Sequence, residues 1–538
     1  MLFNSYEFIL GFLPLVVGLF YVFGRISRTA ALNWVIFASL VFYAWWRPLN
    51  VAIILPSIII NYVLARRLVK LVADDMHARA ARVTLIAGIL FNIAFLGYFK
   101  YTNFLVGATN DAFGTSFVFN QVILPLGISF ITFQKIAFLI DVHGKRVQSF
   151  TFKDYALFVL FFPQLIAGPI VHYREMMPQF QSATCRFDPT SFAVGLTLFC
   201  FGLFKKAFLA DGIAPYVTPI YERAAHGDPV SLVPAIMAAL GFTLQIYFDF
   251  SGYSDMAIGI GRLFGVRLPA NFDSPLRARS IIDYWLRWHM TLTRFLTAYI
   301  YNPMSLWLTR RRLSRGLPAL GGRNATFSAF VTLLAFPTIV TMAASGLWHG
   351  AGYTFVVWGL LHGLMLTINH GWRLVKMKLG RAKVAPSRAA RAGSFLLTFT
   401  AVVVAMVLFR APTMQGAGGI FAGMLGANGI GFPVSIYDHV GPLRGLLEAT
   451  GGGPETWWGA VDFIGLTAYL LALLGIALLA PNTGQILARY EPALGLKTGG
   501  QTRLSWTPSL KWALAVAIVA FAAILRLGGP SEFLYWQF

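Results

Sequence analysis

The chain has 538 residues, of which 57% are hydrophobic and only 12% are charged. Soluble domains carry about a quarter charged residues, so this composition excludes a soluble enzyme, a nucleic-acid-binding module and a disordered scaffold. The 43 basic and 21 acidic residues give a net charge of +22. We assign this charge to basic loops between apolar runs, which face the cytoplasm and attract anionic membrane lipid, and we predict no nucleic-acid partner.

The apolar runs predict an all-α polytopic membrane protein with about 11 to 14 transmembrane and re-entrant helices. Residues 1–24 contain Glu7, no Lys or Arg, and no small-residue cleavage signal. We therefore expect a retained first membrane helix and no signal peptide. The predicted spans are 7–24, 30–46, 50–65, 83–99, 122–141, 155–171, 192–211, 233–249, 284–308, 326–347, 353–372, 394–411, 461–480 and 511–528.

The loop charges predict one orientation for the whole chain. Basic residues gather at 25–28, 66–82, 310–323, 373–391 and 489–511, which we place in the cytoplasm. The loop 412–460 has one basic residue, Arg444, against three acids, and we place it outside. Both termini are then extracytoplasmic. We divide the chain into a membrane core (1–411), an extracytoplasmic loop (412–460) and C-terminal helices with an aromatic tail (461–538).

The first polar constellation interrupts the apolar run near residue 250. Polar backbone and side chains at membrane depth must be buried in protein or line a wet cavity. One interpretation is a cavity wall or a helix break, and the other is a structural polar network between helices. Neither carboxylate has an obvious partner nearby in the sequence. The residues are Gln245, Asp249, Ser251, Tyr253, Ser254 and Asp255.

The second constellation runs from Asn271 to His289. Trp285 and Trp288 are three residues apart and share a helix face if this segment is helical. Tryptophans beside Arg287 are typical of a membrane interface, which would make His289 an interfacial histidine. The alternative is a functional histidine, whose depth depends on whether the 284–308 span is continuous or re-entrant.

The third constellation is Ser345-Gly-Leu-Trp348-His349-Gly-Ala-Gly352, between two apolar spans. Glycines allow close backbone approach, and a neutral imidazole can take a proton from a hydroxyl near neutral pH. His349 is therefore a candidate general base, and the alternative is a buried histidine bonded to backbone. His362, on the next span, is either a core residue or a residue that supports the site from behind.

The tail Glu532-Phe-Leu-Tyr535-Trp-Gln-Phe538 follows the last span, and interfacial anchoring would suffice to explain its aromatic residues. Cys185 and Cys200 are the only cysteines, and the histidines lack metal-ligand spacing, so we predict no metal site and no bound cofactor. No nucleophile elbow and no glycine-rich phosphate loop occurs.

Seven stretches together resemble the membrane-bound O-acyltransferase family. The resemblance is to the bacterial branch that includes the alginate O-acetylation membrane protein and the D-alanyl transfer protein of teichoic acids. It extends from the first helices to about residue 411. The matching stretches are Phe42-Tyr-Ala-Trp-Trp46, Gly97-Tyr-Phe-Lys-Tyr101, Leu124-Pro-Leu-Gly-Ile-Ser-Phe130, Gly168-Pro-Ile170, Tyr247-Phe-Asp-Phe-Ser-Gly-Tyr-Ser-Asp255, Arg287-Trp-His289 and Gly346-Leu-Trp-His-Gly350.

The resemblance implies a ring of helices around a thin centre, where a cytoplasmic thioester meets an acceptor from outside. His349 matches the central catalytic histidine of the family, and His289 matches its second histidine position. The tail resembles an aromatic motif of this branch whose tyrosine, here Tyr535, carries the acyl group. The branch usually has Trp-Leu-Arg-Asp-Tyr after the second histidine, whereas this chain has Phe295-Leu-Thr-Ala-Tyr299.

These observations predict an inner-membrane O-acyltransferase that transfers an acyl group, most simply acetyl, for O-acetylation of an extracytoplasmic polysaccharide. The donor would be acetyl-CoA or an acyl-carrier protein, and the partner an extracytoplasmic acetyltransferase. Two alternatives stay open: D-alanyl or other acyl transfer to teichoic acid, lipid or protein, and a transporter of lipid-linked glycan. The candidate substrate-binding or cavity residues are Asp249, Ser251, Tyr253, Ser254, Asp255, Asn271, Trp285, Arg287, Trp288 and Trp348.

Overall fold

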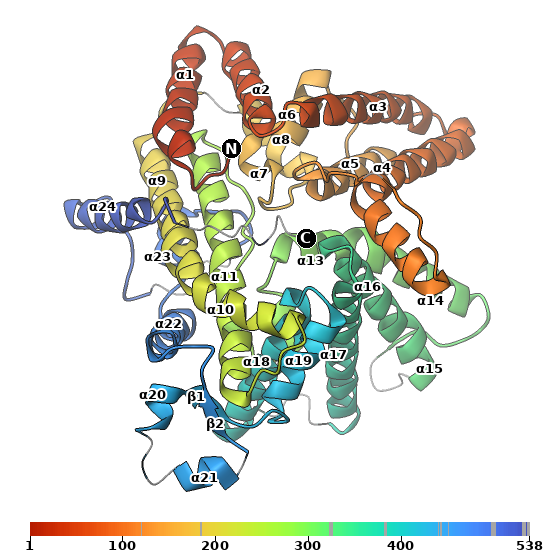
Figure 1. Ribbon diagram of the computed structural model, residues 1–538. Coiled ribbons are helices and arrows are strands. Elements are labelled where there is room, and N and C mark those ends of the chain that lie inside the picture. Colours follow the sequence, from red (N-terminus) through yellow and green to blue (C-terminus); the bar gives the residue numbers. More distant parts are fainter. Residues whose placement is uncertain are drawn as a thin grey trace. The chain divides into compact units, whose positions relative to one another are not determined.

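Figure 1 shows the computed structural model of the chain, which is built almost wholly of helices. It describes residues 1–119, 121–182, 185–321, 326–380, 385–439, 441, 444–449, 451–496, 502–529 and 534. The predicted all-α polytopic class is confirmed.

Eight helices of the described part are long and apolar enough to cross a membrane. Within a bilayer, a helix satisfies its own backbone hydrogen bonds, which is why apolar runs of this length fold as helices. Two further apolar helices, Arg28–Ala44 and Leu510–Leu525, are shorter. The eight are Glu7–Ile26, Leu49–Val72, Ala78–Phe113, Pro189–Ala225, Leu232–Leu263, Phe327–His349, Arg388–Arg410 and Ala460–Leu479.

The chain forms two compact units, and the long helix α11 (Leu232–Leu263) contributes residues to both. The first unit comprises residues 1–207, 251–271 and 483–529. Its further helices are α1 (Leu13–Ile26), α2 (Arg28–Ala44), α3 (Leu49–Val72), α4 (Ala78–Phe113), α5 (Ile128–His143), α6 (Phe152–Leu160), α7 (Phe162–Leu165), α8 (Tyr173–Ser182), α9 (Pro189–Phe204), α23 (Thr483–Ile486) and α24 (Leu510–Leu525).

The second unit comprises residues 208–250, 272–482 and 530–538. It contains the two histidines of interest. Its elements besides α11 are α10 (Asp211–Ala225), α12 (Ile281–Trp285), α13 (Met290–Leu296), α14 (Asn302–Leu313), α15 (Phe327–Phe330), α16 (Phe336–His349), α17 (Tyr353–Lys378), α18 (Arg388–Arg410), α19 (Met414–Met424), β1 (Gly431–Pro433), α20 (Val434–Tyr437), α21 (Arg444–Ala449), β2 (Gly453–Glu455) and α22 (Ala460–Leu479).

Helices α9 and α11 approach closely within the first unit, through glycines spaced seven residues apart. A methyl group added at Gly195 would lie 2.7 Å from the backbone oxygen of Gly259, and one at Gly252 would lie 2.7 Å from that of Gly202. Small residues at such an interface let two membrane helices pack backbone to backbone. This close packing fixes the carboxyl-terminal part of α11, which carries Ser254 and Asp255.

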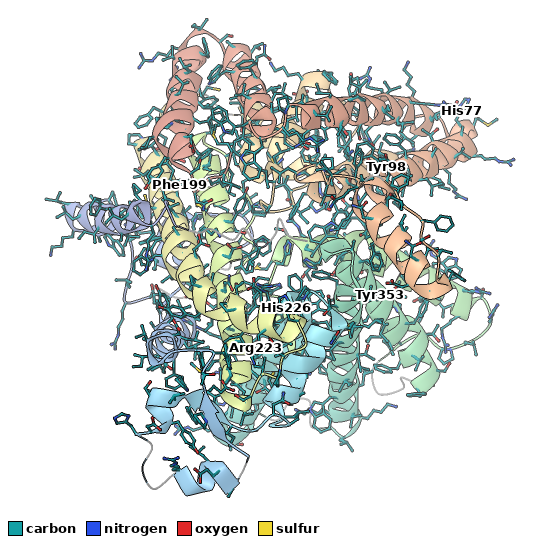
Figure 2. All side chains as sticks on the ribbon, viewed as in Figure 1. His77, Tyr98, Phe199, Arg223, His226 and Tyr353 are labelled. Carbon is teal, nitrogen blue, oxygen red and sulfur yellow. The ribbon has the colours of Figure 1, made fainter. Side chains whose placement is uncertain are left out.

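Helices α16 and α17 form an antiparallel hairpin in the second unit and lie side by side in Figure 1. The short connection Gly350–Gly352 joins them, and Tyr353, labelled in Figure 2, begins α17. Gly359 of α17 meets the backbone of Met342 in α16, so no side chain separates the two helices there. The hairpin therefore holds the end of α16 firmly against α17.

The segment between α18 and α22 folds against the turn that joins α10 to α11. Its two short strands pair in parallel, with Gly431 opposite Gly453. Asn428 donates a hydrogen bond to the backbone oxygen of Val230 at 3.0 Å. The guanidinium of Arg223, at the end of α10 (Figure 2), lies 5.0 Å from the ring centroid of Trp457. The predicted domain boundaries at 411 and 460 stay a prediction.

Several predicted spans differ from the observed helices. The 83–99 span is part of a 36-residue helix, Ala78–Phe113. The predicted span 122–141 is helical only from Ile128. The predicted span 155–171 divides into α6 and α7, because Pro163 has no N–H to donate to the turn before it and so α6 cannot continue through it. The chain leaves the helical conformation after Leu165. The number of membrane-embedded helices and their arrangement in a ring stay predictions.

Candidate active site

His349 is the last residue of α16, and its side chain is buried in aromatic rings. The ring centroids of Trp348, Trp358 and Phe409 lie 4.9, 5.2 and 5.2 Å from that of His349. All three rings meet the imidazole at steep angles, so the contacts are edge to face. The sequence did not single out Trp358 or Phe409, which come from α17 and from the end of α18.

Glycines beside His349 permit this enclosure. A methyl group on Gly346 would overlap the backbone oxygen of Phe355, and one on Gly350 would overlap the Phe355 ring. The two glycines therefore let the start of α17 pass directly beside the histidine. This arrangement is the physical reason for the glycines that the sequence places around His349.

His289 lies where the predicted 284–308 span is broken. Helix α12 ends at Trp285, and α13 begins at Met290. His289 stands between them with a φ of 42° and a ψ of 52°, in the left-handed region that non-glycine residues rarely adopt. Of the two alternatives left open for this span, one continuous helix is excluded, because a left-handed residue turns the chain and ends helical propagation.

The side chain of His289 is fully buried and close to that of His349. The two imidazole centroids are 6.2 Å apart, and the ring of Phe250 meets His289 edge to face at 4.7 Å. A rare backbone conformation persists only where its surroundings impose it, and such residues concentrate at functional sites. The structure thus brings together two histidines that are 60 positions apart in the sequence.

Hydrogen bonds from Arg287 hold the turn that carries His289. The backbone N–H of Asp273 donates to the carbonyl of Arg287 at 3.0 Å, and Arg287 Nη1 donates to the carbonyl of Asp273 at 3.3 Å. Arg287 Nε also donates to Asp283 Oδ1 at 2.8 Å. Asn482 donates to Asp273 Oδ1 at 3.0 Å. These hydrogen bonds show Arg287 holding the turn, and the substrate-binding role predicted for it stays a prediction.

Both tryptophans of this segment are buried, which contradicts the interfacial interpretation. Trp285 is 4% exposed and Trp288 is 3% exposed. Trp288 stacks on Tyr284 with a centroid distance of 5.7 Å, whereas Trp285 Nε1 donates to His362 Nδ1 at 3.3 Å. The two tryptophans do not lie on one helix face, because α12 ends at Trp285.

The residues predicted around position 250 are divided between the two units. Asp249 is buried in the second unit, whereas Ser251, Tyr253, Ser254, Asp255 and Asn271 belong to the first. Within that unit, Asn271 donates to Ser254 Oγ at 3.2 Å. Lys205 Nζ lies 2.6 Å from Asp255 Oδ2, so the fold supplies this carboxylate with a partner that the neighbouring sequence does not contain. A partner 50 residues earlier in the chain cannot be inferred from the sequence around Asp255.

Tyr535, with the rest of the aromatic tail except Leu534, lies outside the described residues. Within the part of the chain that the structure describes, no three His, Cys, Asp or Glu side chains gather as metal ligands would.

Two imidazoles at this separation can flank one reacting carbonyl. A neutral imidazole accepts a proton from a hydroxyl, and a second one can donate a hydrogen bond to an adjacent oxygen. The enclosing aromatic rings exclude water, which favours group transfer over hydrolysis. This arrangement suits transfer of an acyl group to a hydroxyl.

Comparisons with known proteins agree with this chemistry. A family model described as MBOAT, membrane-bound O-acyltransferase family, matches residues 140–317. The probable alginate O-acetylase AlgI of Azotobacter vinelandii is 37% identical over 561 aligned residues, covering 100% of both chains. The peptidoglycan O-acetyltransferase of Helicobacter pylori is 36% identical over 458 residues, covering 80% of this chain and 81% of the relative.

A more distant relative is the teichoic acid D-alanyltransferase of Streptococcus thermophilus. It is 25% identical over 293 residues, which cover 53% of this chain and 68% of the relative. The fold, the paired histidines and these similarities define a multi-pass membrane acyltransferase. The chain belongs to the membrane-bound O-acyltransferase family.

Proposed function

We propose that this enzyme transfers an acetyl group from a cytoplasmic thioester to an extracytoplasmic acceptor, for O-acetylation of a polysaccharide. The observation that carries the proposal is the pair of buried imidazoles with centroids 6.2 Å apart, enclosed by aromatic rings. The relatives named as alginate and peptidoglycan O-acetyltransferases support the acetyl group and the polymeric acceptor.

His349 acts as the general base, and His289 positions or polarises the donor. The acceptor oxygen bonds to the carbonyl carbon while its proton passes to His349. The carbon–sulfur bond then breaks, and the leaving sulfur takes this proton and departs as a thiol. General base catalysis of this kind contributes a rate factor of about 10² to 10⁴.

The predicted orientation places His349 on the acceptor's side. If the basic loops 310–323 and 373–391 are cytoplasmic, α16 and α18 both end outside, and α17 begins there. His349 ends α16, and Phe409, which touches it, is one residue from the end of α18. An acceptor from outside would thus meet His349 first, while the thioester would enter from the cytoplasm.

Tyr535 is the proposed first acceptor, because the tail would lie on the outer side. Phenolate is a weaker base and a better leaving group than a sugar alkoxide. Transfer from thioester to tyrosyl ester to sugar ester therefore runs downhill. A partner acetyltransferase outside the membrane would take the acyl group from Tyr535 to the polymer.

The donor, location and partners complete the proposal. Acetyl-CoA or an acyl-carrier protein supplies the thioester, and the enzyme lies in the inner membrane of a bacterium with both termini outside. The similarity to a teichoic acid D-alanyltransferase favours D-alanyl transfer as the second candidate function. Membership of an acyltransferase family favours an enzyme over the transporter hypothesis.

The test uses the full-length protein in lipid nanodiscs with acetyl-labelled CoA or acyl-carrier protein. We expect wild-type protein to consume the thioester and to retain label that mild base releases as acetate. Absence of thioester consumption with either acetyl donor contradicts acetyl transfer, and consumption of a D-alanyl carrier thioester alone would replace it with the second candidate.

A Tyr535→Phe variant tests the relay, because it keeps the aromatic ring and removes only the hydroxyl. We expect polysaccharide acetylation in cells to fall at least about tenfold, since loss of a nucleophile removes the covalent route. Tyr6→Phe is the matched control, because the Tyr6 hydroxyl donates to the backbone oxygen of Ile524. Normal acetylation in the Tyr535→Phe strain rules out the tyrosyl ester.

A further inference from the structure

Helix α17 carries two buried N–H groups one helical turn apart, the first of them on the Trp358 ring, which contacts His349. Trp358 is 1% exposed and His362 is 0% exposed. Residues four apart on a helix lie on the same face. The ring centroid of Trp358 is 5.2 Å from that of His349 and 4.7 Å from that of His362.

Trp285 determines which nitrogen of His362 carries the proton. An indole nitrogen only donates hydrogen bonds. Trp285 Nε1 lies 3.3 Å from His362 Nδ1, so Nδ1 must be the acceptor. The neutral imidazole therefore carries its hydrogen on Nε2, and protonation of Nδ1 would break the bond from Trp285.

The two N–H groups make no hydrogen bond within the described part of the chain. Both Trp358 Nε1 and His362 Nε2 are buried there without an acceptor. Leaving a buried donor unpaired costs free energy, and an unpaired donor beside a catalytic group calls for an explanation. An acceptor oxygen supplied by the substrate would satisfy both groups.

We propose that Trp358 Nε1 and His362 Nε2 donate hydrogen bonds to the carbonyl oxygen of the acyl donor. This inference rests on the proposed acyl transfer. As the acceptor oxygen bonds to the carbonyl carbon, the π electrons move to the carbonyl oxygen and its negative charge grows. The two N–H groups stabilise this charge until the carbon–oxygen double bond re-forms and the sulfur departs.

The position along α17 agrees with this role. Trp358 lies five residues and His362 nine residues after Tyr353, the first residue of the helix. Each residue advances a helix by about 1.5 Å, so His362 lies about 6 Å further than Trp358 from the start of α17. In the predicted orientation, this direction is toward the cytoplasm, from which the thioester would enter.

The competing interpretation is purely structural. The rings of His362 and Trp358 meet at 62°. In this interpretation the edge of the imidazole packs on the indole and has no part in the reaction. A supporting role predicts effects on unfolding temperature and on acceptor use. A role in charge stabilisation predicts equal losses in every reaction of the donor carbonyl, including its slow hydrolysis without acceptor.

The test compares His362→Asn with His362→Gln in the full-length enzyme. The asparagine oxygen can still accept from Trp285 near the position of Nδ1 but provides no donor at Nε2. The glutamine nitrogen reaches the Nε2 position. We expect His362→Asn to lower kcat for acetyl transfer and for thioester hydrolysis by the same factor, about 10² to 10³. The KM for the donor should stay within about threefold of the wild-type value. The kcat of His362→Gln should be at least about tenfold higher than that of His362→Asn.

Trp358→Phe provides the second arm, because it keeps an aromatic ring and removes Nε1–H. We expect the same parallel loss of transfer and hydrolysis. The controls are Trp372→Phe and His370→Asn, further along the same helix, where Trp372 is 55% exposed. Both controls should retain wild-type rates.

Three outcomes overturn the inference. These are wild-type rates in His362→Asn and Trp358→Phe, a loss confined to transfer with hydrolysis unchanged, or a lower unfolding temperature that accounts for the lost activity. Failure of the wild-type enzyme to consume thioester refutes the proposed function itself. An active wild type with fully active variants refutes only the role of these two donors.

Discussion

We expect replacement of His349 with glutamine to lower acetyl transfer by a factor of about 10² to 10⁴, the contribution of a positioned general base. Glutamine keeps a polar group of similar reach but cannot accept the acceptor's proton at neutral pH. The His349 side chain is 3% exposed and lies against Trp348, Trp358 and Phe409. Because these rings hold residue 349 in place, we attribute the expected loss of rate to the missing base. The measurement is single-turnover transfer from labelled acetyl thioester in nanodiscs.

His226→Gln is the matched control for this prediction. His226, labelled in Figure 2, is exposed and lies just after α10. Its Nδ1 is 2.8 Å from the backbone oxygen of Glu222. We expect its transfer rate to equal that of the wild type. Transfer by the His349→Gln enzyme at more than a tenth of the wild-type rate would show that another group takes the proton.

His289 should act differently from His349, because its backbone and its side chain both matter. Its φ of 42° sets the direction in which α13 begins, and its ring lies 4.7 Å from that of Phe250. A substitution there removes a polar group and also changes the stability of the turn. The two effects are separable, because the hydrogen bonds of Arg287 to Asp273 and Asp283 hold the turn independently of the imidazole.

The sequence predicted the class of fold because membrane helices leave a direct signal in composition. Long apolar runs such as Glu7–Ile26 and Ala460–Leu479 are helices with bounds within two residues of those predicted. The break at His289 could not be predicted in this way. Its cause is one left-handed residue inside an apolar run, and hydropathy does not report backbone dihedral angles.

The candidate site was predicted in part for a similar physical reason. Its histidines stand out because polar groups are expensive at membrane depth. Trp358 and Phe409 are ordinary members of apolar helices, and only tertiary packing places them around His349. The hydrogen bond from Trp285 to His362 joins residues 77 positions apart, which no local sequence pattern could indicate.

Gly346→Ala should destabilise the enzyme although alanine is the better helix former. Alanine gains about 1 kcal/mol over glycine in a helix interior, whereas forcing an extra methyl into a packed interface costs about 1 to 3 kcal/mol. At Gly346 the added methyl would overlap the backbone oxygen of Phe355 and lie 3.2 Å from the Cα of Gly359. Backbone cannot rotate aside as a side chain can, so we expect the upper cost of about 3 kcal/mol. The free energy of unfolding should then fall by about 2 kcal/mol net.

The activity should fall further than the stability requires, because His349 is three residues beyond Gly346 on the same helix. To admit the methyl, α16 must move away from α17, which carries Trp358, and a displacement of about 1 Å at a reacting group can cost about 100-fold in rate. Gly107→Ala in α4 is the control, since no other described atom lies within 4 Å of the added methyl. Thermal unfolding in nanodiscs and single-turnover transfer measure the two effects. If Gly346→Ala matches Gly107→Ala in both, the close packing of α16 on α17 does not position the catalytic histidine.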